Sequence, residues 1–183
     1  AVDGIIGAAY GSAGERCMAI SVAVAVGNIA DELVEKISNK AQTLKVAPWT
    51  DSKAEMGPLI SSEHKKKVLD LIDKGEKEGA KIIIDGRQIK IQGYENGYFV
   101  GPTLFDNVTK DMSIYNEEIF GPVLSVVRVK SYNEALELIN SHRYGNGTSL
   151  YTSDGELSRH FTSNCKIGMV GVNVPIPVPM AFH

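Results

Sequence analysis

Hydrophobic positions along the chain alternate between the spacing of strands and the spacing of helices. Residues 20–26 are dense in β-branched side chains and end at Gly27, which predicts a buried strand. Residues 28–44 then place apolar side chains at helical spacing, and Asn28 is the expected N-cap. The pattern therefore predicts a strand that leads directly into an amphipathic helix.

The same order of elements recurs further along the chain. Residues 61–79 predict a helix that ends at Gly79, and Ile82–Ile84 predict a second buried strand. Asp85-Gly86 resembles a hairpin turn, and Val123–Val129 has the composition of a strand. The other expected elements are an extended segment at 98–100, a helix from Tyr132 capped by Ser131, a strand at 148–151, a short helix after Asp154 and a strand at 169–174.

Strands that alternate with helices predict an α/β fold. The expected architecture has three layers, a mainly parallel sheet with helices on both faces. Residues 1–183 contain no internal repeat and no linker-like stretch, so we expect one domain. Val174–Met180 has a proline at every second position and cannot lie centrally in a sheet, and the chain then ends at His183 as if unfinished.

Composition and charge narrow the classes of partner. The 183 residues carry a net charge of −3, with no basic excess of the kind that nucleic acid requires. The longest apolar stretch, Cys17–Val26, falls well short of the ~20 residues that span a bilayer. Two cysteines are too few for a disulfide framework, which favours a reducing, cytoplasmic compartment, or the mitochondrial matrix if the source is eukaryotic. The sequence thus predicts no nucleic-acid partner, no membrane segment and no bound metal.

One of the two cysteines lies in a setting that suits chemistry. Cys17 follows a loop of small residues, Gly11–Gly14, and comes directly before the first predicted strand. The adjacent Arg16 can favour a thiolate, which is the nucleophilic form of cysteine. A small buried apolar residue is the alternative interpretation of Cys17. Cys165 has no comparable loop and is expected to be structural, and the four histidines, at 64, 142, 160 and 183, are expected to be surface or capping residues.

A second unusual string is Glu117-Glu-Ile-Phe-Gly-Pro122. Two adjacent acids and an aromatic residue precede a Gly-Pro turn and a strand. A carboxylate here could accept hydrogen bonds from two ribose hydroxyls, and a ring could form the wall of a pocket for a flat heterocycle. A solvated acid pair beside a core phenylalanine is the alternative.

Taken together, six short strings resemble the motifs of the aldehyde dehydrogenase superfamily in order and in spacing. They are Gly14-Glu-Arg-Cys17, Met56-Gly-Pro-Leu-Ile60, Gly97-Tyr-Phe-Val-Gly-Pro-Thr-Leu-Phe105, Glu117-Glu-Ile-Phe-Gly-Pro122, Tyr144-Gly145 and Gly168-Met-Val-Gly-Val-Asn173. The resemblance covers essentially the whole chain. Glu15 stands where the family usually has glutamine, and Asn146-Gly-Thr148 also departs from the common pattern. Both departures, and the proline-rich end, resemble the branch that oxidises methylmalonate and malonate semialdehydes.

The resemblance implies a covalent mechanism that uses NAD, with the choice between NAD and NADP left open by the sequence. Cys17 would attack the aldehyde carbon, hydride would pass to the nicotinamide, and a thioester would remain on sulfur. Coenzyme A would accept the acyl group, and carbon dioxide would be lost. Arg16 would bind the substrate carboxylate, Glu118 the nicotinamide ribose, and Phe120 would lie beside it. Asn173 corresponds to a position near the substrate tunnel, where a structural role is at least as plausible as a catalytic one.

The resemblance also implies that other parts of the enzyme are encoded elsewhere. A nucleotide-binding domain, the general base and a second carboxylate-binding arginine would precede residue 1, and an oligomerisation strand would follow residue 183. The chain alone is therefore expected to be inactive, and the full-length subunit to form a homo-oligomer, a dimer or tetramer. Two alternatives remain: a hydrolytic aldehyde dehydrogenase, or a non-catalytic module that associates through a bare sheet edge.

Overall fold

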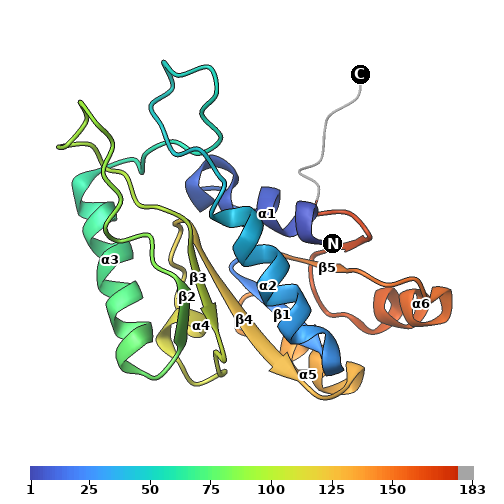
Figure 1. Cartoon of the computed structure of the whole chain (residues 1–183). Helices are drawn as coiled ribbons and strands as arrows, with labels where there is room; N and C mark the ends of the chain where they lie inside the picture. Colours follow the sequence, from blue (N-terminus) through green and yellow to red (C-terminus); the bar gives the residue numbers. More distant parts are fainter. Residues whose placement is uncertain (177–183) are drawn as a thin grey trace.

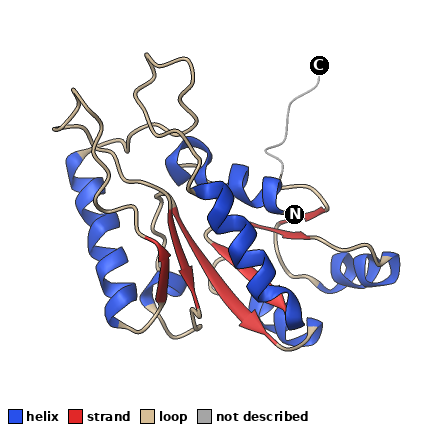
Figure 2. Cartoon of the chain, viewed as in Figure 1, coloured by secondary structure: helices blue, strands red, loops and turns tan. Residues whose placement is uncertain are grey.

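The computed structural model describes residues 1–176 and shows strands with helices on both sides (Figures 1 and 2). The helices, with two 3₁₀ turns, are α1 (Val2–Tyr10), η1 (Gly11–Gly14), η2 (Gly27–Ile29), α2 (Ala30–Ala41), α3 (Ser62–Lys77), α4 (Ser113–Asn116), α5 (Tyr132–Ser141) and α6 (Gly155–Asn164). The strands are β1 (Val22–Val26), β2 (Lys81–Ile84), β3 (Thr103–Asp106), β4 (Val123–Val129), β5 (Gly147–Leu150) and β6 (Met169–Val172).

Four of these strands form one sheet in the order β1-β4-β3-β2. β4 lies at its centre and runs parallel to both β1 and β3, while β2 joins the far edge antiparallel to β3. β5 and β6 pair in parallel as a separate two-stranded sheet. The predicted three-layer, mainly parallel α/β architecture is confirmed, with β2 as its antiparallel edge.

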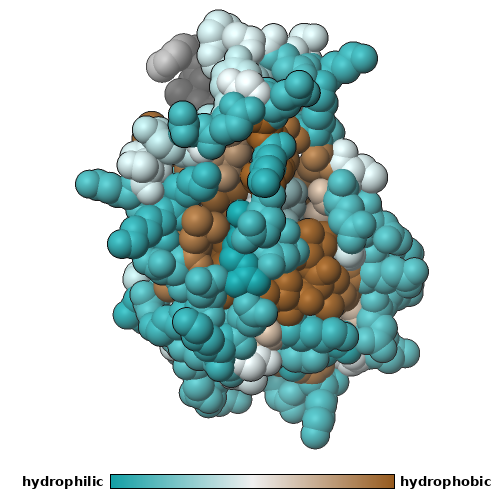
Figure 3. All heavy atoms as spheres, turned by 60° about the vertical axis from the view of Figure 1, so that its left-hand side comes forward, coloured by the Kyte–Doolittle hydropathy of each residue, from teal (hydrophilic) through white to brown (hydrophobic). Residues whose placement is uncertain are grey.

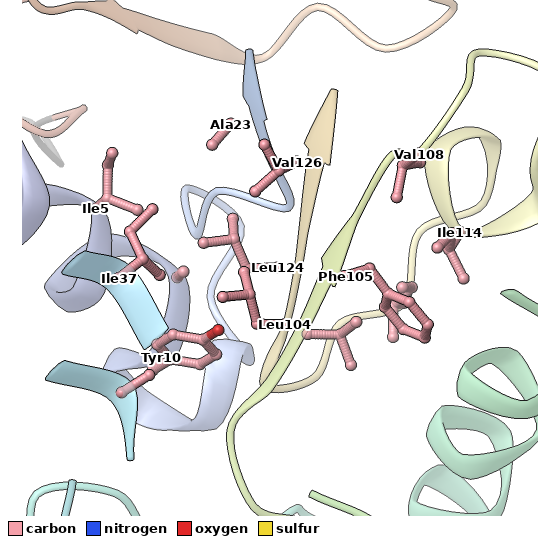
Figure 4. Packing of buried hydrophobic residues seen from close by; sticks show 14 of the residues in the cluster. Ile5, Tyr10, Ala23, Ile37, Leu104, Phe105, Val108, Ile114, Leu124 and Val126 are labelled. Carbon is pink, nitrogen blue, oxygen red and sulfur yellow. The ribbon is translucent and has the colours of Figure 1, made fainter. Parts of the chain in front are cut away.

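The core lies on both faces of the central strands. Leu104 and Leu124 point toward Tyr10 of α1 and Ile37 of α2, whereas Phe105 points toward Ile114 of α4 (Figure 4). Neighbouring residues of β3 therefore serve opposite layers, because successive side chains of a strand point to opposite faces. This two-sided burial explains why β3 and most of β4 consist of continuous buried positions.

Most expected elements form where the sequence pattern places them, and the local capping chemistry shows why. Ser61, Ser131 and Asp154 each cap a helix through a side-chain oxygen that accepts a backbone N–H. Gly79, in the left-handed region at φ +100°, follows the end of α3. The helix start expected at Asn28 is wrong, because residues 27–29 form a 3₁₀ turn and no side chain caps α2.

Two further expectations are wrong near β2, and one element was not foreseen. Ile82–Ile84 are only half-buried, because β2 is an edge strand. No tight hairpin forms at Asp85-Gly86; Gly86 instead packs against Gly101, and its carbonyl accepts the Gly101 N–H at 2.9 Å. The sequence pattern also gave no indication of α1. The proline-rich pattern beyond residue 176 and His183 lie outside the described residues.

Polar and charged side chains cover most of the face shown in Figure 3, with apolar areas visible between them. This mosaic is usual, because a protein has too few polar side chains to cover its whole surface. Among residues 1–176, no helix combines the length and apolar character that crossing a bilayer requires.

Candidate active site

The loop that carries Cys17 is fixed by the end of α1. Tyr10, the last residue of this helix, is fully buried, and its hydroxyl donates to the Thr103 carbonyl of β3 at 3.0 Å. Burial raises the pKa of the Tyr10 phenol above its usual value, so the hydroxyl keeps the proton that this bond needs. The loop therefore leaves the helix from a point that is anchored to the central sheet.

The loop itself has an unusual backbone. Ser12 and Ala13 both have φ of 53°, and Gly14 follows at 71°, so three successive residues are left-handed. A left-handed residue with a side chain costs about 1–2 kcal/mol, and strain of this kind tends to occur at functional sites. The turn leaves Cys17 exposed, just ahead of the half-buried segment that enters β1. The Cys17 N–H has no acceptor within the described part of the chain.

The string from Glu117 to Pro122 follows α4, and the structure separates its two acids. Glu117 forms an ion pair with Lys74 of α3 at 2.9 Å. The exposed Glu118 carboxylate has no partner among residues 1–176, while the Glu118 carbonyl accepts a hydrogen bond from Lys67 at 3.0 Å. Phe120 is 36% exposed with a left-handed φ of 58°, so it is not a core residue. Glu118 and Phe120 are thus the two members of this string that are free to bind a ligand.

Tertiary packing brings the Cys17 loop against this string. A Cβ atom added to Gly14 would lie 2.1 Å from the Gly121 carbonyl oxygen, so the two backbones are in direct contact. Next to this contact, the Glu15 carboxylate accepts the Ile60 N–H at 3.1 Å and lies 3.5 Å from Nε2 of His64. The candidate nucleophile and the candidate ribose-binding segment are therefore neighbours.

The same network joins all six strings that resemble family motifs. Leu59 N–H donates to the Tyr98 carbonyl at 2.9 Å, and Thr103 N–H donates to the Pro122 carbonyl at 2.8 Å. Gly168 N–H donates to the Gly145 carbonyl at 2.9 Å. The side chain of Asn146, which directly follows Gly145, donates to the Cys17 carbonyl at 2.8 Å. Segments far apart in the sequence thus form one continuous structure around Cys17.

Arg16 and Asn173 both form hydrogen bonds to the backbone of this chain. The Arg16 guanidinium donates to the Gly7 carbonyl near the end of α1 at 2.9 Å. An arginine has five N–H donors, so this bond leaves capacity for a carboxylate. Asn173 exchanges two hydrogen bonds with the backbone of Thr152, at 2.9 and 2.8 Å. The structural interpretation of Asn173 fits this geometry.

Comparison with known proteins shows which family shares the sequence and structure of this chain. A family model described as the aldehyde dehydrogenase family matches residues 1–182. The chain belongs to the aldehyde dehydrogenase family. The crystal structure of methylmalonate-semialdehyde dehydrogenase from Oceanimonas doudoroffii shares 54% identity and a TM-score of 0.96 with this aldehyde dehydrogenase domain, over 100% of this chain and 38% of that one.

Other members of the family are also similar to this chain over nearly its whole length. The malonate-semialdehyde dehydrogenase of Pseudomonas aeruginosa is 54% identical over 184 residues, which takes in 100% of this aldehyde dehydrogenase chain and 37% of that protein. A structure of Staphylococcus aureus betaine aldehyde dehydrogenase in complex with NAD+ has a TM-score of 0.93 at 30% identity, over 97% of this chain and 35% of that one. The present chain thus spans little more than a third of the length of these relatives.

The residues present suit one wall of a nucleotide site. Glu118 offers a carboxylate that has no partner among residues 1–176, and Phe120, two residues later, exposes a ring on a backbone held from α3. Two surface hollows of about 460 and 300 Å³ lie on the outer face of α3 and at residues 89–99, and Cys17 lines neither of them. The 460 Å³ hollow reaches Glu117.

Sequence reasoning missed two polar side chains of this aldehyde dehydrogenase site. His64, expected to be a surface or capping residue, is only 17% exposed, and its Nε2 lies 2.6 Å from the Phe120 carbonyl oxygen. Asn146 was noted only as a departure from the family pattern. The position of His64 three residues after the cap Ser61 could have indicated that its ring faces the loops before α3, but Asn146 gave no such indication.

The two cysteines are expected to differ in reactivity toward iodoacetamide. Cys17 is exposed, whereas burial raises the pKa of the Cys165 thiol and leaves less thiolate near neutral pH. Cys17 should therefore be carbamidomethylated several-fold faster, and the difference should narrow as the pH rises. Peptide mass spectrometry over time measures both rates in one sample. Equal, slow reaction of both thiols would contradict the assignment of Cys17 and would favour a non-catalytic module.

Proposed function

We propose that this chain is the nucleophile-bearing catalytic domain of a CoA-acylating dehydrogenase for malonate or methylmalonate semialdehyde. The observation that carries the proposal is the exposed Cys17 on a left-handed loop that packs directly against the segment of Glu118 and Phe120. The names of the relatives support the substrate class. The NAD complex of a Sinorhizobium meliloti protein, provisionally named methylmalonate-semialdehyde dehydrogenase and 57% identical to this chain, supports the cofactor.

In this proposal the Cys17 thiolate forms a C–S bond to the aldehyde carbon, and the carbonyl oxygen becomes an alkoxide. The N–H of Cys17, which has no acceptor among the described residues, would donate to that oxygen and so stabilise its charge. Arg16, next along the chain, would bind the substrate carboxylate through its remaining donors. The chain thus supplies the nucleophile, half of an oxyanion site and one anchor for the substrate.

Glu118 and Phe120 would hold the nicotinamide end of NAD, Glu118 by accepting ribose hydroxyl protons and Phe120 by packing beside the ring. Bound NAD supplies the acceptor for the hydride that leaves the substrate carbon. The acyl group then remains on Cys17 as a thioester. Loss of the substrate carboxylate as carbon dioxide would leave an electron pair on the α-carbon, which would take up a proton from solvent. The thiol of coenzyme A, having given its proton to a base outside this chain, would then displace Cys17 from the thioester and give acetyl-CoA or propionyl-CoA.

The experiment that tests this function uses the intact subunit that contains this chain. NADH formation from malonate semialdehyde is followed by absorbance, with and without coenzyme A. Coenzyme A is expected to raise the steady-state rate, and acetyl-CoA is expected to accumulate in step with NADH. A rate that does not respond to coenzyme A, with a free acid as product, would instead indicate a hydrolytic aldehyde dehydrogenase.

The 183-residue chain alone provides a control for the same assay. The remaining wall of the pocket, the rest of the nucleotide site and the general base are proposed to come from the part of the subunit outside this chain. The chain alone should therefore form no NADH. NADH formation by the chain alone would overturn the proposed division of the site.

A further inference from the structure

The backbone of His64 is fixed by the capped start of α3. It is the third residue of α3, and its backbone N–H donates to the hydroxyl of the cap Ser61 at 3.1 Å. Its side chain is 17% exposed, so the ring lies largely inside the fold. The helix start therefore fixes where the imidazole can reach.

The ring of His64 meets two separate segments. Nε2 lies 2.6 Å from the Phe120 carbonyl oxygen and 3.5 Å from Oε1 of Glu15. Because a carbonyl oxygen only accepts, the proton must be on Nε2, and that N–H donates to Phe120. The imidazole also meets the Phe120 ring edge-on, with ring centroids 6.3 Å apart.

Glu15 is held equally firmly. Its side chain is 15% exposed and accepts the Ile60 N–H at 3.1 Å with the same oxygen that faces His64. Glu15 lies two residues before Cys17. The Nε2–H donates to Phe120, so Glu15 at 3.5 Å acts on the imidazole through its charge and not through a hydrogen bond of its own, and a glutamine amide would lack that charge.

The backbone at Phe120 needs such support. Its φ of 58° is left-handed, which is strained for a residue with a bulky side chain and persists only when surrounding contacts fix it. The His64 hydrogen bond fixes the Phe120 carbonyl, and the bond from Lys67 to the Glu118 carbonyl fixes the same segment two residues earlier. Both donors come from the first turns of α3.

We propose that the Glu15–His64 pair is a positioning device that sets the Phe120 backbone relative to Cys17. Its importance for catalysis rests on the proposed function, but the coupling itself is a property of the fold. The side chain of Glu15 reaches the segment of Phe120 through His64, which acts on the Phe120 carbonyl, in addition to the backbone contact between Gly14 and Gly121. The pair thus transmits the position of the cysteine loop to the residues that would hold the nicotinamide end of NAD.

The coupling can be measured by ¹⁹F NMR on the 183-residue chain labelled with 4-fluorophenylalanine. The chain has five phenylalanines, and the Phe120→Leu variant assigns the Phe120 resonance. His64→Leu is expected to shift and broaden this resonance, and His64→Gln, which keeps an N–H donor, to restore part of the change. Glu15→Ala is also expected to shift the Phe120 resonance, although Glu15 has no described contact with the Phe120 ring. Glu15→Gln is expected to cause a smaller shift.

His160→Leu is the matched control. His160 bonds to the Tyr132 hydroxyl at 2.8 Å, and the Tyr132 ring meets Phe161, so this variant should move the Phe161 resonance and leave Phe120 in place. If the Phe120 resonance in Glu15→Ala coincides with that of the unsubstituted chain, the proposal is overturned. If His64→Leu fails to fold, with all resonances collapsed, then His64→Gln and Glu15→Gln decide.

A second measurement separates this inference from the proposed function. In the intact subunit, His64→Leu should raise KM for NAD more than it lowers kcat, and His64→Gln should recover part of the loss. An unchanged KM together with a shifted Phe120 resonance would support the coupling and contradict the role given to Phe120. An unchanged resonance would overturn the coupling, whatever the kinetics.

Discussion

Replacing Cys17 with serine is expected to abolish NADH formation by the intact subunit, with kcat lower by on the order of 10⁴-fold or more. A serine hydroxyl is a far weaker nucleophile than a thiolate, and the site shows no base beside Cys17 that would activate it among the described residues. The loop that carries Cys17 is held by Tyr10 and Gly14 rather than by the thiol, so the variant should keep the fold. Rapid-quench assays at saturating NAD measure the loss.

Cys165→Ser is the control for this experiment. Cys165 caps the end of α6, is half-buried and lies outside the network around Cys17, so its replacement should leave kcat nearly unchanged. Mass spectrometry of a reaction quenched without coenzyme A should also find the acyl adduct on Cys17 in the Cys165→Ser protein. Substantial turnover by Cys17→Ser, or an adduct on another residue, would show that the nucleophile lies elsewhere.

Replacing Gly14 with alanine is expected to give the largest loss of stability at the site, about 2–5 kcal/mol in the free energy of unfolding. The residue is left-handed at φ 71°, and the new Cβ would lie 2.1 Å from the Gly121 carbonyl oxygen. Backbone atoms cannot yield as the end of a flexible side chain can, so the two segments must separate. Chemical denaturation followed by circular dichroism measures the change.

Gly7→Ala is the matched control for this substitution. Gly7 lies within α1, is exposed and has nothing within 4 Å of an added Cβ, so alanine should raise stability by about 0.5–1 kcal/mol through its higher helix propensity. A Gly14→Ala variant as stable as the unsubstituted chain would mean that the cysteine loop does not pack on the Glu117–Pro122 string as the structure shows.

Much of the fold follows from local chemistry. Ser61, Ser131 and Asp154 cap helices because their oxygens satisfy free N–H groups within a few residues. The strand at Val123–Val129 was predicted with its observed bounds because five of its seven residues are apolar and mostly β-branched, as expected for a strand that is covered on both faces. The hairpin expected at Asp85-Gly86 failed because Gly86 packs against Gly101, which no pattern near Gly86 can indicate.

The candidate site likewise combines features that are visible in the sequence with contacts that form only in the folded chain. The sequence by itself determined that Cys17 follows a loop of small residues and that an aromatic residue and two acids precede a strand, and the order of the strings indicated the family. Only the tertiary structure decided that Glu117 is bound to Lys74 while the Glu118 carboxylate has no partner in the described part of the chain. It also decided that Gly14 touches Gly121 and that His64 lies between Glu15 and Phe120. Caps and periodicity act between residues a few positions apart, so they are visible in the sequence. The contacts of Glu117, Gly14 and His64 just named join residues that are 43 to 107 positions apart, and these exist only once the sheet has brought its strands together.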